Sequence, residues 1–386
     1  SINAPSAVRE TPMRIDRLDI YYVSMPLIYP WRTAYGEDHA IDSVLVKATS
    51  GDATAWSEAT PFRAPHYVPE SAGTVYHLVS EIFGPLVVGR EFDTAADLDA
   101  RLAPFKGNGF AKAAIELLWW TLETKRTGTP LHTLVGGSDA DVIAGADFGI
   151  LDSFDDLLAD IQKAVDAGFP RIKLKARPGW DVEMLHAVRG SFPDAIFHID
   201  CNAGYTLDDL DTFKTIDQFR LAFIEQPLQW DDVMDHAELS RHIETPVCLD
   251  ESARELRMIQ QALEINACQY VNIKPGRSGG FTRSIKIHDM CRDAGVPVWI
   301  GGMLESSVGA ALAIELATLP NFTYPGDLFP SSKFYVQDLA EPALELTDNL
   351  TFTPLTTLPE PVPERLEAMT IKTTTLTQAD ALPDHK

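Results

Sequence analysis

Cysteine is scarce in this sequence, and no two cysteines form a CxxC pair. The cysteines that occur stand far apart, and each lies in or beside an apolar run. This distribution favours buried, reduced thiols over disulfides or zinc ligands. The residues concerned are Cys201, Cys248, Cys268 and Cys291.

Positive charge is also in short supply, with 32 lysines and arginines against 56 aspartates and glutamates. The resulting formal charge of -24 repels phosphate, which argues against nucleic acid and anionic membranes as partners. A small anionic substrate is still compatible with this charge, because a bound cation or a local group of lysines can reverse the potential inside one cleft.

Long apolar segments and several familiar catalytic motifs are missing. No run of about 18 apolar residues occurs, and the first 16 residues lack the apolar centre of a signal peptide, so we expect a cytoplasmic protein. HExxH and GxSxG motifs are absent. The fragment Gly107-Asn108-Gly109 has Lys112 where a dinucleotide-binding loop needs glycine, and residues 276–280 lack the lysine of a phosphate-binding loop.

The length of 386 residues and the apolar content of 45% are typical of a globular protein with two domains. Strand-like alternation over residues 13 to about 60 gives way to helical spacing over residues 71 to about 134. Strands followed by helices predict a small α+β domain over residues 13–137.

The pattern changes after Gly137 to short β-branched or apolar runs, each followed by a helical stretch. Eight such runs favour a (β/α) barrel over residues 138–330, with a doubly wound sheet as the alternative. Residues 331–386 return to mixed strands and prolines, and we expect them to pack back on the first domain and to fray over roughly the last ten residues. The eight runs are 143–150, 171–175, 196–201, 221–226, 247–250, 270–274, 296–301 and 322–324.

Five consecutive runs end in an ionisable residue. These residues are Lys175, Asp200, Glu225, Asp250 and Lys274, at intervals of 25, 25, 25 and 24 positions. Such an interval accommodates one strand, one crossover helix and two short loops, so the five side chains should stand at the same end of neighbouring strands. In a parallel barrel, this end carries the active site.

The three acidic members of this series predict a metal site. Neighbouring strands lie about 4.8 Å apart, so carboxylates on three of them can converge on one hard cation. Oxygen ligands favour Mg²⁺, with Mn²⁺ as the alternative, and no histidine stands at the matching strand ends to favour zinc. We therefore predict that Asp200, Glu225 and Asp250 bind a divalent cation.

The two lysines predict proton transfer. Lys175 ends the second run and Lys274 the sixth, so in a closed ring of eight they should approach a substrate from opposite faces. Removal of a proton next to a carboxylate forms an enolate, whose charge a bound metal would stabilise. Lys173 (which shares a strand face with Lys175), the divalent cation and Arg277 each add positive charge that should disfavour the ammonium forms of the two lysines.

At these residues the chain resembles the enolase superfamily, and within it the muconate-lactonising subgroup with its o-succinylbenzoate synthase and N-acylamino acid racemase family. The similarity extends over residues 13–346. The motifs that carry it are Lys173-x-Lys175, Asp200-x-Asn202, Glu225-Gln226-Pro227, Asp250-Glu251-Ser252, residues 272–277 with Gly279-Gly280, residues 301–306, and residues 319–323 with Pro325-Gly326-Asp327.

The resemblance implies a (β/α)7β-type TIM barrel whose mouth is covered by the N-terminal α+β domain, which the C-terminal tail completes. It implies that Lys175 and Lys274 are the acid/base pair, that the three carboxylates bind Mg²⁺ and that Arg277 tunes Lys274. We also expect a small carboxylate substrate and a homo-oligomer. Supporting or substrate-contacting side chains would be Lys173, Asn202, Glu251, Met303 and Glu305, with Arg32, Tyr35 and Tyr67 on two loops of the N-terminal domain.

One residue departs from the family pattern. At the end of the first run the family usually has a small hydroxyl residue near the acyl group of the substrate, whereas Asp147 stands there in this chain. An unpaired carboxylate would repel a succinyl group. We therefore expect Asp147 either to pair with a cation or to select a positively charged substrate.

The main functional hypothesis is Mg²⁺-dependent abstraction of the proton α to a substrate carboxylate through a metal-stabilised enolate. The enolate would then lose water, as in o-succinylbenzoate synthases, or be reprotonated, as in racemases. Muconate cycloisomerase and dipeptide or betaine epimerase are alternatives, although the last run lacks the Asp-x-Asp of dipeptide epimerases. A non-catalytic binding homologue is the alternative from another class, and the five intact strand-end residues argue against it.

Overall fold

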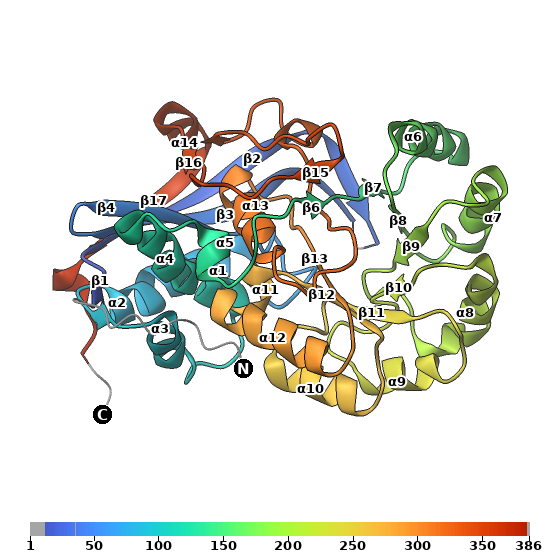
Figure 1. Cartoon of the computed structure of the whole chain (residues 1–386), viewed down its shortest axis with the longest axis horizontal. Coiled ribbons are helices and arrows are strands. Elements are labelled where there is room, and N and C mark those ends of the chain that lie inside the picture. Colours follow the sequence, from blue (N-terminus) through green and yellow to red (C-terminus); the bar gives the residue numbers. More distant parts are fainter. Residues whose placement is uncertain (1–11, 35, 384–386) are drawn as a thin grey trace.

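The structure is a computed structural model that describes residues 12–34 and 36–383. The molecule has two parts (Figure 1). The N-terminal part consists of an antiparallel sheet with helices, and it lies beside a curled parallel sheet that is surrounded by helices. Each part has its own extensive hydrophobic core. Among the described residues, no helix combines the length and the hydropathy that a membrane crossing requires.

A four-stranded antiparallel sheet forms the centre of the N-terminal part. Strands β2 (Arg17–Thr33) and β3 (Gly36–Ser50) make a long hairpin, and β4 (Ala53–Ala59) extends it on one side. On the other side β2 pairs with β17 (Thr370–Thr377) from the far end of the chain. The C-terminal tail therefore completes the N-terminal sheet, as the sequence predicts.

Helix α4 (Gly109–Thr127) is buried along most of its length, because it lies between this sheet and the barrel helices. The fully buried Glu116 on α4 accepts hydrogen bonds from the backbone N–H groups of Phe281 and Thr282 at the start of a barrel helix. A negative charge at a helix N-terminus is favourable, so this contact joins the two parts. The other elements here are α1 (Ala72–Leu78), a π-helical turn (Val79–Phe83), α2 (Gly84–Val87), α3 (Ala95–Leu102), α5 (Leu131–Leu134) and the pair β1 (Met13–Arg14) and β5 (Glu91–Phe92).

Seven parallel strands, ordered β7 to β13 without interruption, form the curled sheet. Their residues are buried on both faces almost throughout, because helices cover the outside and side chains fill the inside. The strands are β7 (Ala146–Phe148), β8 (Ile172–Lys175), β9 (Phe197–Asp200), β10 (Ile224–Glu225), β11 (Val247–Leu249), β12 (Tyr270–Ile273) and β13 (Val298–Ile300). The main helices are α6 (Phe154–Ala167), α7 (Val182–Ser191), α8 (Leu210–Ile216), α9 (Met234–Ser240), α10 (Leu256–Glu264), α11 (Pro275–Ser278), α12 (Phe281–Asp293) and α13 (Ser307–Leu316).

The eighth run does not form a strand, which corrects the prediction for residues 322–324. Phe322 makes one isolated parallel bridge to Val298, and Gly326 makes another to Ala144. Pro325, which lies between the two bridges, has no N–H with which to continue a ladder. The segment therefore links the two edges of the curled sheet without regular strand structure. The first predicted run is also divided, into β6 (Val142–Ile143) and β7.

The C-terminal segment contacts both parts of the molecule. Strand β15 (Thr351–Phe352) pairs with β6, whereas β14 (Ala340–Glu341) pairs with β16 (Glu360–Pro361) ahead of α14 (Pro363–Met369). Leu382 donates to the carbonyl of Pro85 at 2.8 Å, so the chain is anchored there rather than frayed. Residues 384–386 lie outside the described part, and the limits 13–137, 138–330 and 331–386 stay predictions. All four cysteines are buried and free, as expected.

Candidate active site

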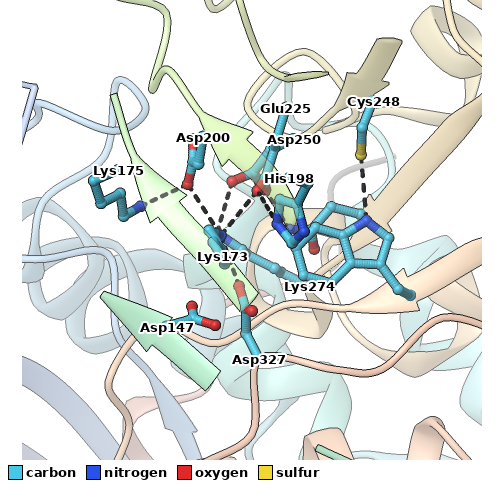
Figure 2. Close-up of polar contacts among 12 residues, drawn as sticks. Asp147, Lys173, Lys175, His198, Asp200, Glu225, Cys248, Asp250, Lys274 and Asp327 are labelled. Carbon is cyan, nitrogen blue, oxygen red and sulfur yellow. Dashed lines mark hydrogen bonds and ion pairs between the residues drawn. The ribbon is translucent and has the colours of Figure 1, made fainter. Parts of the chain in front are cut away.

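The even spacing of the strand-end residues corresponds to register in the sheet. Lys175, Asp200 and Glu225 are directly paired neighbours on β8, β9 and β10. Asp250 follows β11 and Lys274 follows β12, each by one residue. All five side chains are buried at the carboxyl ends of their strands and converge on one region (Figure 2).

The three carboxylates lie close enough to share a cation. One oxygen from each of Asp200, Glu225 and Asp250 lies within 4.8 Å of the others, and none of the three residues is more than 1% exposed. The donor set consists of oxygen only, which suits a hard divalent cation. Glu225 Oε2 is buried and accepts no hydrogen bond, and its ion-pair partner is Lys173, whose Nζ lies 2.9 Å away. The triad therefore fits the cation that the sequence predicts for it.

Lys173 compensates part of this negative charge. Its Nζ lies 3.0 Å from Asp200 and 2.9 Å from Glu225, and it donates to Asp327 at 2.7 Å (Figure 2). Burial lowers the pKa of Lys173, but the surrounding carboxylates raise it more, so the net pKa is well above the ordinary value. Burial and the charge of Asp200 raise the pKa of Glu225 well above its ordinary value. The carboxylates are thus held together against their mutual repulsion.

Lys175 and Lys274 line the same cavity, which we call the central cavity; Tyr67, Asp147 and Phe329 also line it. Lys175 Nζ donates to Asp200 at 2.5 Å and to Asn202 at 3.0 Å. Lys274 Nζ donates to Asp250 at 2.9 Å. The two amines therefore reach the triad from β8 and from the end of β12, with the cavity in common.

Opposing charges set the pKa of Lys274. Burial and Arg277 do lower the pKa of Lys274, but the adjacent carboxylate of Asp250 acts against them, and the net direction is upward. The reason is that the Asp250 carboxylate lies 2.9 Å from the Lys274 amine, whereas the charge of Arg277 is itself paired with Asp250. Tyr67 also donates to Asp250 at 2.6 Å, and the Lys274 amine lies 4.5 Å from the centre of the Tyr67 ring.

The remaining predicted supporting residues surround the two lysines. Asn202 Nδ2 donates to Glu251 at 3.2 Å, and burial together with the charge of Asp250 raises the pKa of Glu251 to about 8. Met303 Sδ lies 3.5 Å from Lys274 Nζ. The backbone N–H of Met303 donates to Glu305 at 2.9 Å, and burial raises the pKa of Glu305 to about 7.

Of the three predicted residues on the two N-terminal loops, the structure brings one to the cavity. Tyr67 lines it, together with Trp31 and Phe62. Arg32 does not, because its half-exposed guanidinium is paired with Glu37 at 2.5 Å and Asp152 at 2.6 Å. Tyr35 lies outside the described residues.

Asp147 pairs with a cation, which is the first of the two outcomes expected for it. Arg171, 1% exposed, forms an ion pair with Asp147 and another with Asp327 at 2.5 Å. Burial raises the pKa of Asp147, the charge of Asp327 raises it further, and Arg171 lowers it. The Asp147 carboxylate on β7 is therefore neutralised by the protein itself.

Arg171 and Asp327 are absent from the sequence-based site, although both had a signal. Arg171, Lys173 and Lys175 alternate along one strand, so three cations share a face. Asp327 comes after the eighth run, much as the other acids stand at the ends of their runs. Because the strand pattern of the eighth run is weak, Asp327 is not recognisable as a strand-end residue in the sequence.

Comparison with known proteins agrees with this geometry. The family model described as Enolase C-terminal domain-like matches residues 156–355, and the mandelate racemase / muconate lactonizing enzyme N-terminal domain matches residues 17–136. The chain is 39% identical to an N-succinylamino acid racemase of Thermus thermophilus, over 88% of this chain and 92% of that protein. It is also 39% identical to an o-succinylbenzoate synthase of Bacillus subtilis, over 86% and 90%.

A solved structure of an enolase superfamily member from Listeria innocua has a TM-score of 0.90 at 30% identity, and the match covers 95% of this chain and all of that one. A curled parallel sheet with acids and lysines at its strand ends, beneath a capping domain, thus defines a member of the enolase superfamily. Within it, the chain belongs to the o-succinylbenzoate synthase and N-acylamino acid racemase family of enzymes. Members of this superfamily use a divalent metal ion.

Proposed function

We propose that this protein is a Mg²⁺-dependent enzyme that removes the proton α to the carboxylate of a small substrate, as o-succinylbenzoate synthases and N-acylamino acid racemases do. The observation that carries the proposal is the pair Lys175 and Lys274, which line one cavity and each contact an outer carboxylate of the buried triad. The names of the relatives support both the synthase and the racemase activity.

Asp200, Glu225 and Asp250 would hold Mg²⁺, with Mn²⁺ as the alternative. When bound, the cation offsets the negative charge that develops on the substrate carboxylate as the α-proton leaves. A substrate carboxylate held at the triad would place its neighbouring carbon between the two lysines. Lys175 and Lys274 would then act on opposite faces of that carbon.

In racemisation, one lysine removes the α-proton and the other, as an ammonium, donates a proton to the opposite face. In the synthase reaction, Lys175 would remove the α-proton and, as the resulting ammonium, return a proton to the β-hydroxyl group, which leaves as water, while Lys274 flanks the other face as a cation. Both reactions share the proton abstraction. Around these lysines, Asn202, Glu251 and Arg277 would position the reacting groups through the contacts described above.

The proposal is tested by exchange of the α-proton in D₂O, followed by NMR with both enantiomers of N-succinyl amino acids. Lys274→Ala should abolish racemisation and reduce exchange of one enantiomer by roughly 10²–10⁴-fold. Exchange of the other enantiomer should persist, and Lys175→Ala should show the opposite preference. Lys163→Ala, on an exposed helix face, is the matched control. An equal loss of α-proton exchange for both enantiomers would contradict the opposed arrangement of the two lysines. The dehydration is measured separately, by an ultraviolet assay on the o-succinylbenzoate precursor.

A further inference from the structure

Lys333 lies beside the central cavity in an unusual environment. It ends the short 3-10 helix Ser331–Lys333, and its Nζ donates to the backbone carbonyl of Asp147 at 3.0 Å. The ammonium is 4.2 Å from the centre of the Phe329 ring and 5.4 Å from that of Phe334. Asp147 and Phe329 both line the central cavity, so the amine lies directly behind two residues of the cavity wall.

The charge of Lys333 has no carboxylate partner within 4.0 Å among residues 12–34 and 36–383. The nearby acids are already engaged, since Asp147 pairs with Arg171 and Asp327 with Arg171 and Lys173. Burial lowers the pKa of Lys333 to about 8, although Asp147 and Asp327 raise it. The aromatic faces compensate only part of the lost hydration of an ammonium.

The other cations in the cavity differ in this respect. Lys173, Lys175 and Lys274 are each ion-paired with acidic side chains. An ammonium has three N–H donors, and in the described chain Lys333 uses one of them, toward Asp147 O. The amine therefore retains unused donor capacity for an anion next to the part of the cavity wall that Asp147 and Phe329 form.

We propose that Lys333 is a specificity residue that pairs with a second carboxylate of the substrate, at the far end of its acyl arm. This inference rests on the proposed function. A substrate with one carboxylate at the metal triad would extend through the cavity, and a dicarboxylate arm such as succinyl would bring its terminal carboxylate toward Asp147 on β7. Arg171 prevents repulsion there because it neutralises Asp147.

The test compares N-succinyl-phenylalanine with its terminal amide, which has the same shape without the second charge. A hydrogen bond to a charged group corresponds to roughly a 10- to 100-fold difference in kcat/KM, so the wild type should prefer the acid by that factor. Lys333→Gln keeps a donor for the Asp147 carbonyl but removes the charge, and it should reduce the preference to less than about threefold. Lys333→Arg should retain the preference, and Lys372→Gln, remote from the cavity, should leave it unchanged.

Two results with the Lys333→Gln variant would overturn the inference. One is a Lys333→Gln variant that keeps the wild-type preference, and the other is a variant that loses activity equally on the acid and the amide. N-acetyl-phenylalanine separates this failure from that of the proposed function. If the wild type exchanges the α-proton of N-acetyl-phenylalanine but does not prefer the succinyl acid over its amide, the role of Lys333 alone is refuted. If it exchanges none of the three compounds, both proposals are refuted.

Discussion

Replacing Arg171 should show how much the site depends on a neutralised Asp147. Arg171 is 1% exposed and bridges Asp147 and Asp327. Arg171→Met keeps most of the stem, and Asp327 would still pair with Lys173 at 2.7 Å. Asp147 would be left as an unpaired buried carboxylate. Removing one partner of a buried pair costs about 3–5 kcal/mol, and we expect this loss in the free energy of unfolding at pH 8.

The size of the loss should depend on pH. Burial raises the pKa of Asp147 already, and Arg171 acts against that shift. Without Arg171 the folded-state pKa rises further above the unfolded value, so the folded state holds the proton more tightly. Stability then falls as pH rises from the unfolded pKa to the folded pKa. The destabilisation should therefore be smaller at pH 5 than at pH 8.

The measurement is urea unfolding, followed by tryptophan fluorescence at pH 5, 6.5 and 8. The double variant Arg171→Met with Asp147→Asn lacks the carboxylate, so it should recover much of the stability at pH 8 and lose the added pH dependence. Arg292→Met, on a partly exposed helix surface, serves as the control. A double variant as unstable at pH 8 as Arg171→Met, with the same loss at every pH, would assign the effect to packing and refute the argument from charge.

Chelation of divalent cations should abolish proton exchange, and Mg²⁺ should restore it; activity indifferent to a chelator would refute the metal role. Mg²⁺ should also raise the thermal midpoint by binding the folded state, an effect that Asp250→Asn should greatly reduce. Glu116→Ala should lower the free energy of unfolding by about 1–3 kcal/mol for each buried N–H that it leaves unsatisfied, because Phe281 and Thr282 donate to Glu116. Urea unfolding measures this against the exposed control Glu81→Ala, and equal midpoints for the two variants would show that Glu116 does not join α4 to α12.

The central features of the site could be predicted because they are encoded locally. Each βα unit occupies a nearly constant length of chain, so residues 25 positions apart lie side by side on neighbouring strands. Lys175 is therefore paired with Asp200, and Asp200 with Glu225. Alternation along β8 likewise placed Lys173 on the face of Lys175. The fold class followed from the same repeat, since each strand and helix carries its own periodicity.

The sequence by itself determined the order of charged groups around the strand ends, because spacing and periodicity set strand register. Only the tertiary structure decided which charges meet. Arg171 pairs with Asp327 across 156 positions of chain, and Arg32 turns to Asp152 instead of the cavity. It also decided that residues 322–324 connect the edges of the sheet without forming a strand. Ion-pair partners are chosen by distance and burial in the packed molecule, and no local pattern contains that information.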